Sequence, residues 1–486
     1  MVSPTRTQLC APLSRRTFIA GTGLAITAFA LPSRGQAQSP PSGELAADGF
    51  RILRARASTA AVRGDGQSPT PVWGYDGAVP GPMLRFKRGE ELKVRLINEL
   101  PEPTVIHWHG VRVPNAMDGT PHLTQAAVEP GARFDYRFKL PDAGTYWYHA
   151  HLFTSEQVER GLYGVLLVEE PAPPDVDRDV MLVFDDWRLN PDGSLHEASF
   201  RSMHDAAHLG RVGEHLTVNS RPALDVPVRT NERIRLRLLN AANARLLALR
   251  LEEHQPVVMA IDGQPAEPFP ARGGRIVLGP GNRVDIFVDA RLAPGATAAI
   301  VLETGTAQVP IGRLVYEPGA PARPQPRPEP RKLPSNPLPE RMAFAGALKL
   351  DVPLEGGAMR MAMREGGREV PGHGLDPRAR IWTMAGQASS GHHGPPLFTV
   401  KRGRTVMLAF PNRTAFPHGM HVHGHHFRLL DALDDGWKPY WLDTVVVMPD
   451  QTVRIAFVAD NPGKWMLHCH MLEHAETGMA AWFEVT

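Results

Sequence analysis

A short segment near the carboxyl end of the chain brings together side chains that bind soft metal ions. Cys469 is followed by His474 and then by Met479, in one strand and the loop after it. A thiolate, two imidazoles and a thioether form the copper site that transfers electrons, and three of these four ligands are present here. His468 and His470 flank the cysteine, and on an extended strand they point to the opposite face. The segment therefore predicts two metal sites joined through adjacent residues.

Four His-x-His pairs extend this chemistry. Eight imidazoles are too many for one ion, but three ions that take two, three and three of them would use all eight. Imidazole binds copper, zinc, iron and nickel, so the pairs alone do not name the metal, whereas the cysteine-centred set favours copper. A single pair is as easily explained by solvated histidines on a strand, but four pairs at equivalent positions are not. The pairs are His107 and His109, His149 and His151, His421 and His423, and His468 and His470.

An internal repeat accounts for the positions of these pairs. Alternating apolar stretches that end at Asn98, Asn240 and Asn412 share one pattern, and a second strand pattern that begins with proline follows each of them. Many short alternating strands between Gly/Pro turns are typical of β-sandwiches. The sequence therefore predicts an all-β protein built from three copies of one domain.

The histidine pairs occur in the first and last copies only. In both, a pair begins nine residues after the repeated asparagine, whereas residues 249–251 of the middle copy are Leu-Arg-Leu. Ala150 stands where Cys469 stands, and Thr104 stands where His418 stands. We therefore expect the thiolate site in the last domain and the shared imidazole cluster at the interface of the first and last domains.

The domain boundaries follow from the repeat and from two changes of composition. The twin arginines Arg15 and Arg16, followed by a short apolar run, indicate a twin-arginine export signal. A Pro-rich stretch before the last copy indicates a stiff, extended linker. We expect a signal peptide at 1–37, domains at 45–171, 172–322 and 342–486, and a linker at 323–341.

The leader affects both the charge and the cysteine count. It carries four arginines and no acid, so its removal takes the formal net charge from +2 to −2, which does not favour nucleic acid as a partner. Cys10 leaves with it, and Cys469 is then the only thiol in an exported chain, where cysteines normally form disulfides. The apolar run is too short for a stable membrane span. We expect a periplasmic or secreted protein, exported by the twin-arginine machinery.

These motifs together resemble the three-domain multicopper oxidases of the laccase and bacterial cuprous-oxidase group. The resemblance covers all three domains and rests on His-Trp-His-Gly, His-Ala-His, the His418-x-x-His421-x-His423-Gly motif and the Cys469 segment. It implies three cupredoxin-like Greek-key β-sandwich domains. It also implies four copper ions, with electrons entering at a type 1 copper, passing through Cys469 and reducing O2 to water at a trinuclear cluster.

The resemblance carries a ligand set over to this chain. It assigns His418, Cys469, His474 and Met479 to type 1 copper, and His107 and His421 to type 2. It assigns His109, His149 and His470 to one type 3 copper, and His151, His423 and His468 to the other.

Three acids near the ligand motifs are candidates for proton supply. Asp118 resembles the family acid near the type 2 copper, although an Asp-Gly turn explains it equally simply. Many bacterial relatives place a glutamate directly after the last type 1 histidine. Ala475 stands there in this chain, so Glu473 or Glu476 takes over or protons arrive by another route.

Three functions compete. A laccase-type oxidase would act on phenols or aromatic amines, and a copper-tolerance enzyme would oxidise Cu(I). A non-enzymatic copper-binding cupredoxin protein is disfavoured, because every copper ligand is present. The acid and methionines that cuprous oxidases carry before the first type 1 histidine are missing at 414–417, and Met359, Met361 and Met363 form only a short echo of their Met-rich insert.

Overall fold

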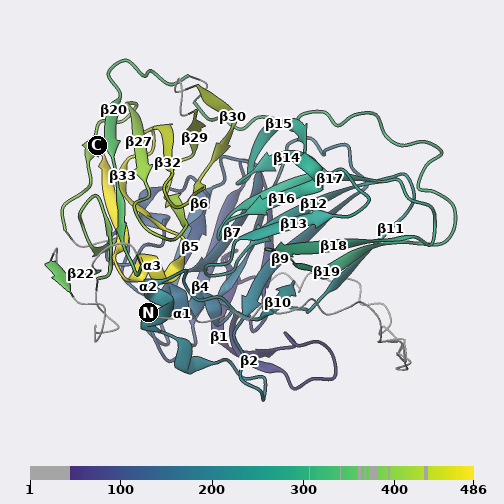
Figure 1. Cartoon of the computed structure of the whole chain (residues 1–486), viewed down its shortest axis with the longest axis horizontal. Helices are drawn as coiled ribbons and strands as arrows, with labels where there is room; N and C mark the ends of the chain where they lie inside the picture. Colours follow the sequence, from purple (N-terminus) through teal and green to yellow (C-terminus); the bar gives the residue numbers. More distant parts are fainter. Residues whose placement is uncertain are drawn as a thin grey trace, which may run out of the picture. The chain divides into compact units, whose positions relative to one another are not determined.

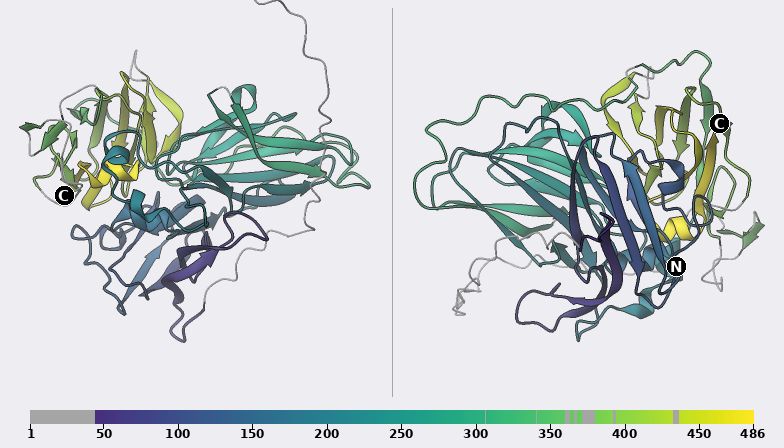
Figure 2. Two further views of the ribbon diagram at one scale, coloured as in Figure 1. Left: turned by 60° about the horizontal axis from the view of Figure 1, so that its bottom comes forward. Right: turned by 180° about the vertical axis from the view of Figure 1, so that it is seen from behind.

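Strands dominate the fold, as the alternating patterns predict (Figure 1). The computed structural model describes residues 44–486 except 306, 340, 360–362, 366–367, 371–379, 392–393 and 432–435. The predicted leader, Met361 and the side chain of Met363 lie outside the described residues. Figure 2 shows the sheets of the first repeat in purple to blue, those of the middle repeat in teal, and those of the last in green to yellow.

The first repeat consists of two four-stranded sheets, ordered β2-β1-β4-β6 and β3-β8-β7-β5. Every second side chain of β4 is buried, as the alternating sequence predicts. In the second sheet β5 pairs antiparallel with β7, and both strands carry His-x-His pairs. The strands are β1 (Arg51–Ala60), β2 (Thr70–Tyr75), β3 (Gly81–Lys87), β4 (Glu91–Asn98), β5 (Ile106–His109), β6 (Arg133–Lys139), β7 (Gly144–Ala150) and β8 (Tyr163–Glu169).

The middle repeat has sheets of six and five strands, ordered β10-β9-β12-β17-β14-β15 and β11-β19-β18-β13-β16. All residues of β12 are buried, including three arginines that form ion pairs. The strands are β9 (Arg178–Trp187), β10 (His215–Val218), β11 (Leu224–Val228), β12 (Glu232–Asn240), β13 (Leu247–Leu251), β14 (Val257–Ile261), β15 (Gln264–Pro270), β16 (Arg275–Leu278), β17 (Arg283–Ala290), β18 (Thr297–Thr304) and β19 (Ala307–Tyr316).

The last repeat is built on the sheets β20-β27-β32-β29-β30 and β25-β34-β33-β28-β31, with β26 added at β34 and two small hairpin-like sheets, β21-β24 and β22-β23. The strands are β20 (Leu348–Asp351), β21 (Leu354–Gly356), β22 (Met363–Glu365), β23 (Arg368–Val370), β24 (Trp382–Met384), β25 (Ser389–Ser390), β26 (Thr399–Val400), β27 (Thr405–Pro411), β28 (His418–Val422), β29 (Phe427–Leu430), β30 (Trp437–Leu442), β31 (Thr444–Val447), β32 (Thr452–Val458), β33 (Gly463–Cys469) and β34 (Met479–Val485).

The three repeats share one topology. In each, the strand that ends at the repeated asparagine pairs parallel with the first strand and antiparallel with a later one, as β4 does with β1 and β6. The strand β12 pairs in the same way with β9 and β17, and β27 with β20 and β32. This arrangement confirms the all-β fold of three cupredoxin-like sandwiches.

The helices are short and lie at the ends of the sandwiches. They are α1 (Thr154–Glu159), α2 (Met203–Ala207) and α3 (Leu472–Glu476), with 3-10 turns η1 (Asn115–Met117), η2 (Glu197–Ser199) and η3 (Arg272–Gly274). The three α-helices come from different repeats and lie side by side (Figure 1). In the described part of the chain no helix has the length and apolar character needed to cross a membrane.

The first and last repeats share one hydrophobic core, whereas the middle repeat has a core of its own. Buried side chains of the first and last repeats, Trp108 and Trp465 among them, belong to one continuous cluster. The middle repeat packs most of its apolar side chains in a separate core around residues such as Leu236 and Ile286. The first and last repeats are therefore packed against one another, as a shared histidine cluster requires.

The repeated asparagines have the same structural task in all three domains. The Asn240 side chain donates to the carbonyls of Arg245 and Leu278 and accepts from the Ala242 amide, which fastens the end of β12 to the following loop and to β16. Asn98 and Asn412 make the equivalent contacts, and all three are buried. A buried loop end needs these partners because its polar backbone groups are shielded from water.

Replacing Asn240 by alanine is expected to lower the free energy of unfolding by about 1–3 kcal/mol, because buried backbone groups lose their partners. Urea unfolding followed by circular dichroism measures the loss. Asn115→Ala is the comparison, since the described Asn115 side chain makes a single hydrogen bond, to the Lys464 carbonyl. Equal stability of the Asn240 variant and the wild type would contradict this role.

Candidate metal centre

Strand pairing brings the His-x-His pairs together. The register of β5 on β7 places His107 opposite His149, and the register of β28 on β33 places His421 opposite His468. The residue between the two histidines of a pair points the other way, and Trp108 accordingly lies in the hydrophobic core. All four pairs are therefore presented on one face of their strands.

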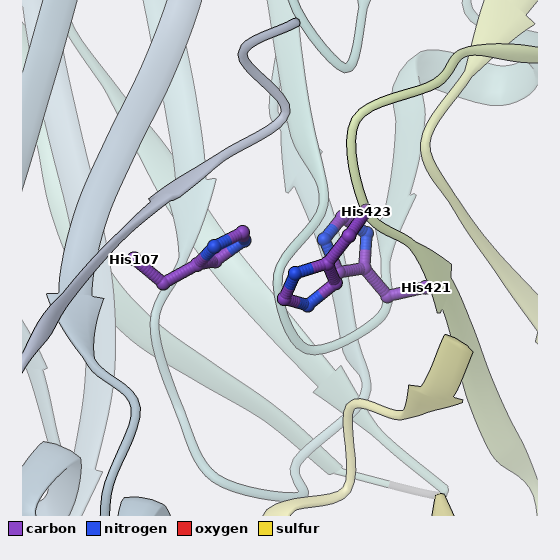
Figure 3. Close-up of side chains that lie close together, drawn as sticks. All are labelled: His107, His421 and His423. Atoms are coloured by element: carbon purple, nitrogen blue, oxygen red, sulfur yellow. The ribbon is translucent and has the colours of Figure 1, made fainter. Parts of the chain in front are cut away.

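The eight imidazoles converge in one buried cluster. Each is at most 6% exposed. Figure 3 shows His107, from the first repeat, facing His421 and His423 from the last. Candidate ligand atoms lie within 4.8 Å of one another in three sets: His107, His421 and His423; His107, His109 and His149; and His151, His423 and His468. His470 joins them through its ring, whose centroid lies 4.9 Å from that of His109.

One ring nitrogen of most of these imidazoles is fixed by a hydrogen bond to an acceptor, which sets the tautomer. A backbone carbonyl accepts from Nδ1 of His107, His149, His421 and His468 at 2.7–2.9 Å. Carboxylates hold Nδ1 of His423, through Asp118 at 2.9 Å, and Nε2 of His109, through Asp443 at 3.1 Å. Partners of this kind orient imidazoles for metal binding.

The opposite nitrogens are buried and have no hydrogen-bond partner among the residues that the structure describes. They are Nε2 of His107, His149, His151 and His421, Nδ1 of His109, and both ring nitrogens of His470. The Nε2 atoms of His423 and His468 face each other at 3.1 Å. Lone pairs that converge without a donor fit a set of cations, because buried polar atoms are otherwise almost always paired.

Burial favours the neutral form of most of these imidazoles. It lowers the pKa of His109, His149, His151, His423 and His470 well below the usual value, and neighbouring imidazoles lower it further. Burial lowers the pKa of His468 to about 3. Neutral imidazole is the form that binds a metal ion, so no proton has to leave these rings.

A second site is formed by His418, Cys469 and His474. The Cys469 Sγ lies 3.6 Å from His418 Nδ1 and 3.7 Å from His474 Nδ1, and the two nitrogens are 3.1 Å apart. Outer hydrogen bonds turn both Nδ1 atoms inward: His418 Nε2 donates to Thr414 Oγ1, and His474 Nε2 donates to the His208 carbonyl. Burial raises the pKa of the thiol to about 12, so a bound cation is needed to keep it deprotonated.

Met479 lies at the beginning of β34, fully buried in the same hydrophobic cluster as Cys469. Trp382 closes the site from another side, with its ring centroid 4.3 Å from that of His474. The site is thus enclosed by apolar and aromatic groups, as a site that transfers electrons without binding water requires.

The two sites are adjacent along β33. His468 and His470 belong to the imidazole cluster, whereas the side chain of Cys469 between them faces His418 and His474. This is the alternation of an extended strand. Only covalent bonds of neighbouring residues separate the thiol from the cluster.

The whole chain is similar to known copper enzymes. Family models described as multicopper oxidase match residues 56–173, 178–310 and 373–486. The multicopper oxidase MmcO of Mycobacterium tuberculosis is 31% identical over 439 residues, which cover 84% of this chain and 81% of that protein. The chain belongs to the multicopper oxidase family. It is therefore an oxidoreductase that uses a copper cofactor and transfers electrons from a small-molecule reductant to O2.

Other multicopper oxidases align with this one over most of their length. The crystal structure of the enzyme from Pseudomonas thermotolerans has a TM-score of 0.79 and 33% identity and covers 90% of this chain and 99% of that one. A laccase-like enzyme from Ochrobactrum sp., described as active towards lignin model compounds, has a TM-score of 0.75 and 25% identity, with coverage of 92% and 100%. A copper resistance protein A homolog from Pseudomonas syringae pv. tomato is 26% identical, with 98% of both chains covered.

Asp118 lies within the imidazole cluster of this multicopper oxidase. It is buried, its Oδ2 accepts from His423 Nδ1 and from Thr120 Oγ1, and its carbonyl accepts from His107 Nδ1. Gly119 makes the turn possible, because a Cβ there would lie 1.8 Å from the Ile106 carbonyl oxygen. The sequence placed Asp118 near the cluster; the structure adds that it holds two of the imidazoles.

Glu473 and Glu476, the other two candidate acids, have hydrogen-bond partners outside the imidazole cluster. Glu473 accepts from the Asn243 side chain, and burial raises its pKa to about 7. Glu476 accepts from the amide and hydroxyl of Ser155, and burial raises its pKa as well. Neither is a hydrogen-bond partner of the eight clustered imidazoles in the described structure.

Asp443 is a site residue that the sequence analysis missed. Its carboxylate is buried and accepts from His109, while its backbone carbonyl accepts from His421. The one local signal is an acid between the apolar strands β30 and β31, where a charged side chain is unexpected without a partner.

Replacing Cys469 by serine is expected to abolish the blue absorption of the thiolate site, because that colour comes from charge transfer between sulfur and copper. The clustered imidazoles are unchanged, so copper that they hold should be retained. Absorption spectra and copper content per chain measure both effects. A serine variant that stays blue and oxidises substrate would show that the thiolate site lies elsewhere.

Proposed function

We propose that this enzyme is a laccase-type oxidase that takes single electrons from phenols or aromatic amines. Four electrons and four protons would then convert one O2 to two waters. The observation that carries the proposal is the adjacency of the two sites along β33. A site that accepts one electron at a time is joined covalently to a cluster able to hold several metal ions.

We assign the ligands by the family resemblance, and the convergence of the histidines in one buried cluster supports the assignment. His418, Cys469, His474 and Met479 would hold type 1 copper, and His107 and His421 would hold type 2. The two type 3 coppers would be held by His109, His149 and His470 and by His151, His423 and His468. Bound there, the coppers would supply one-electron oxidation at the thiolate site and four-electron reduction of O2 at the imidazole site. The protein orients the ligands, excludes water and delivers protons.

Asp118 is the acid that we assign to proton delivery. Its Oδ2 is shared by Thr120 and His423, whereas its buried Oδ1 has no hydrogen-bond partner. This oxygen lies 3.5 Å from His107 Nδ1, the ring nitrogen that also donates to the Asp118 carbonyl. A carboxylate in this place can hold a proton on Oδ1 while Oδ2 keeps its hydrogen bonds.

Replacing Asp118 by asparagine should preserve copper content and the blue colour, because no ligand is removed. Turnover should fall by roughly 10²–10⁴, the effect of losing a positioned proton donor. Stopped-flow reoxidation of the reduced enzyme by O2 measures the step directly. Thr120→Val is the control, since it removes a hydrogen-bond donor to Asp118 but leaves the carboxylate. Reoxidation of the asparagine variant at the wild-type rate would return proton delivery to Glu473, Glu476 or solvent.

Oxidation of Cu(I) is the second candidate, and one observation favours it. Met359 is 80% exposed, and its thioether is a soft ligand. The preceding residue, Ala358, donates a backbone hydrogen bond to Ala207, next to His208, whose carbonyl binds His474. The exposed thioether thus belongs to the residue after Ala358, which is hydrogen-bonded beside His208, and His208 covers the thiolate site.

Oxygen uptake by the copper-loaded enzyme, with a phenol and then with Cu(I), distinguishes the two substrates. The laccase proposal expects uptake with the phenol and an unchanged rate in Met359→Leu, which keeps most of the side-chain volume. Uptake with Cu(I) alone, lowered in Met359→Leu, would overturn it in favour of the second candidate.

A further inference from the structure

The middle repeat has none of the clustered histidines, yet it reaches the imidazole cluster. A loop at 279–282 precedes β17, and a Cβ on Gly281 would lie 3.0 Å from His109 Cε1 and 3.2 Å from His470 Cδ2. With φ at +83°, this position also requires a backbone conformation that suits glycine. The loop is therefore packed directly against two of the imidazoles.

The residue that follows this loop carries a buried charge. Arg283 is completely buried at the start of β17, and its guanidinium binds both carboxylate oxygens of Asp443 in the last repeat. It also donates to the Gly281 carbonyl at 2.8 Å and to the Thr145 carbonyl in the first repeat at 3.2 Å. One side chain of the middle repeat thus joins all three repeats.

Asp443, which binds Arg283, also accepts hydrogen bonds from two imidazoles. Its Oδ1 accepts from His109 Nε2 at 3.1 Å, and its carbonyl accepts from His421 Nδ1 at 2.9 Å. The Thr444 hydroxyl, which donates to Asp443 Oδ1, lies 3.0 Å from His421 Nδ1. His109 comes from the first repeat and His421 from the last. Asp443 therefore lies where these two repeats meet and contacts an imidazole of each.

A second acid of the middle repeat fixes the backbone at the same place. Asp262 Oδ2 accepts from the amides of Asp443 and Thr444, each at 3.2 Å, and Asp262 Oδ1 accepts from the Arg283 amide at 3.0 Å. The middle repeat thus holds both the side chain and the main chain of residues 443–444.

We propose that Arg283, with Asp262, is a positioning residue of the trinuclear copper site and acts through Asp443. This inference rests on the proposed function, which places copper among the eight imidazoles. The physical reason lies in the tautomer of His109. An ionised carboxylate only accepts hydrogen bonds, so His109 must carry its proton on Nε2, which leaves Nδ1 free for a metal ion. Nδ1 is the buried, unpaired nitrogen of that ring.

Arg283 keeps the carboxylate in this place. Its guanidinium binds both carboxylate oxygens, so that Oδ1 stays directed at His109 Nε2. Without Arg283, the Asp443 carboxylate could rotate away from His109, and either ring nitrogen of His109 could then carry the proton. The ligand geometry at the cluster would then be lost even though every ligand is present.

The test compares Arg283→Gln with Arg237→Gln. Arg237 is a matched control because it is also a buried arginine of the middle repeat, pairs with Asp285 and Asp179, and donates to Thr145 of the first repeat. In the described part of the chain its guanidinium forms no hydrogen bond or ion pair with a histidine of the cluster. Copper retained after dialysis against a graded chelator is measured for each protein, with type 2 copper followed by electron paramagnetic resonance and type 1 copper by the blue absorption.

We expect Arg283→Gln to weaken copper binding at the imidazole cluster by about 10–100-fold, the usual effect of removing a partner that orients a metal ligand. The blue thiolate site should be unaffected, and the type 2 resonance of the remaining copper should shift. The control should behave as the wild type. Equal copper retention and equal spectra in the two variants would overturn the proposal.

A double variant separates positioning from folding. Arg283→Gln with Asp443→Asn removes both charges of the bidentate ion pair, while Asp262 keeps its hydrogen bonds from Asn282 and from backbone amides, and thermal stability should partly recover relative to the single variant. Copper binding at the cluster should stay weak, because without the guanidinium the amide of residue 443 can turn its NH2 group toward His109 and then no longer fixes the proton of that ring. Recovery of copper binding together with stability would overturn the proposal. A wild-type chain that binds only type 1 copper would instead contradict the proposed function.

Discussion

Seven ring nitrogens of the central cluster are buried without a hydrogen-bond partner, and this is the constraint on which the rest of the structure depends. Leaving a buried polar atom unpaired costs about 1–3 kcal/mol, so the protein alone holds these rings in an unfavourable arrangement. Copper bound at these nitrogens, as we propose, would offset that cost. Metal binding and folding would then be coupled in this enzyme, and the copper-free protein is expected to be the less stable form.

The three repeats divide the work of meeting this constraint. The first and last supply histidines from paired strands, and their hydrophobic cores merge so that the two halves of the cluster stay in register. The middle repeat keeps the fold and its fastening asparagine, Asn240, but has lost the histidines. Its Asp262 and Arg283 bind Asp443, which in turn accepts a hydrogen bond from His109 of the cluster.

Features that repeat locally could be predicted from the sequence. Alternation, the asparagine that ends a strand and the His-x-His spacing predicted the all-β fold and the residues that gather in the centre. Contacts between distant segments were not predictable in the same way. His109 and Asp443 are 334 residues apart, and His474 and His208 are 266 apart, so no spacing rule connects them. Carboxylates and carbonyls that orient the imidazoles are single residues without a repeated pattern, and they emerge only when the sheets are assembled.

The covering of His474 has a consequence for the choice of electron donor. This imidazole is fully buried, and its outer nitrogen is occupied by the His208 carbonyl. If this is the site of electron entry, as the proposed function has it, a donor that arrives at this surface would meet the peptide group of His208 before His474, and its electron would have to tunnel through that group. Shape complementarity to the metal site would then contribute little to selection. Donors would be ranked instead by how readily they give up an electron, which would favour a broad range of easily oxidised molecules over one tightly fitted compound.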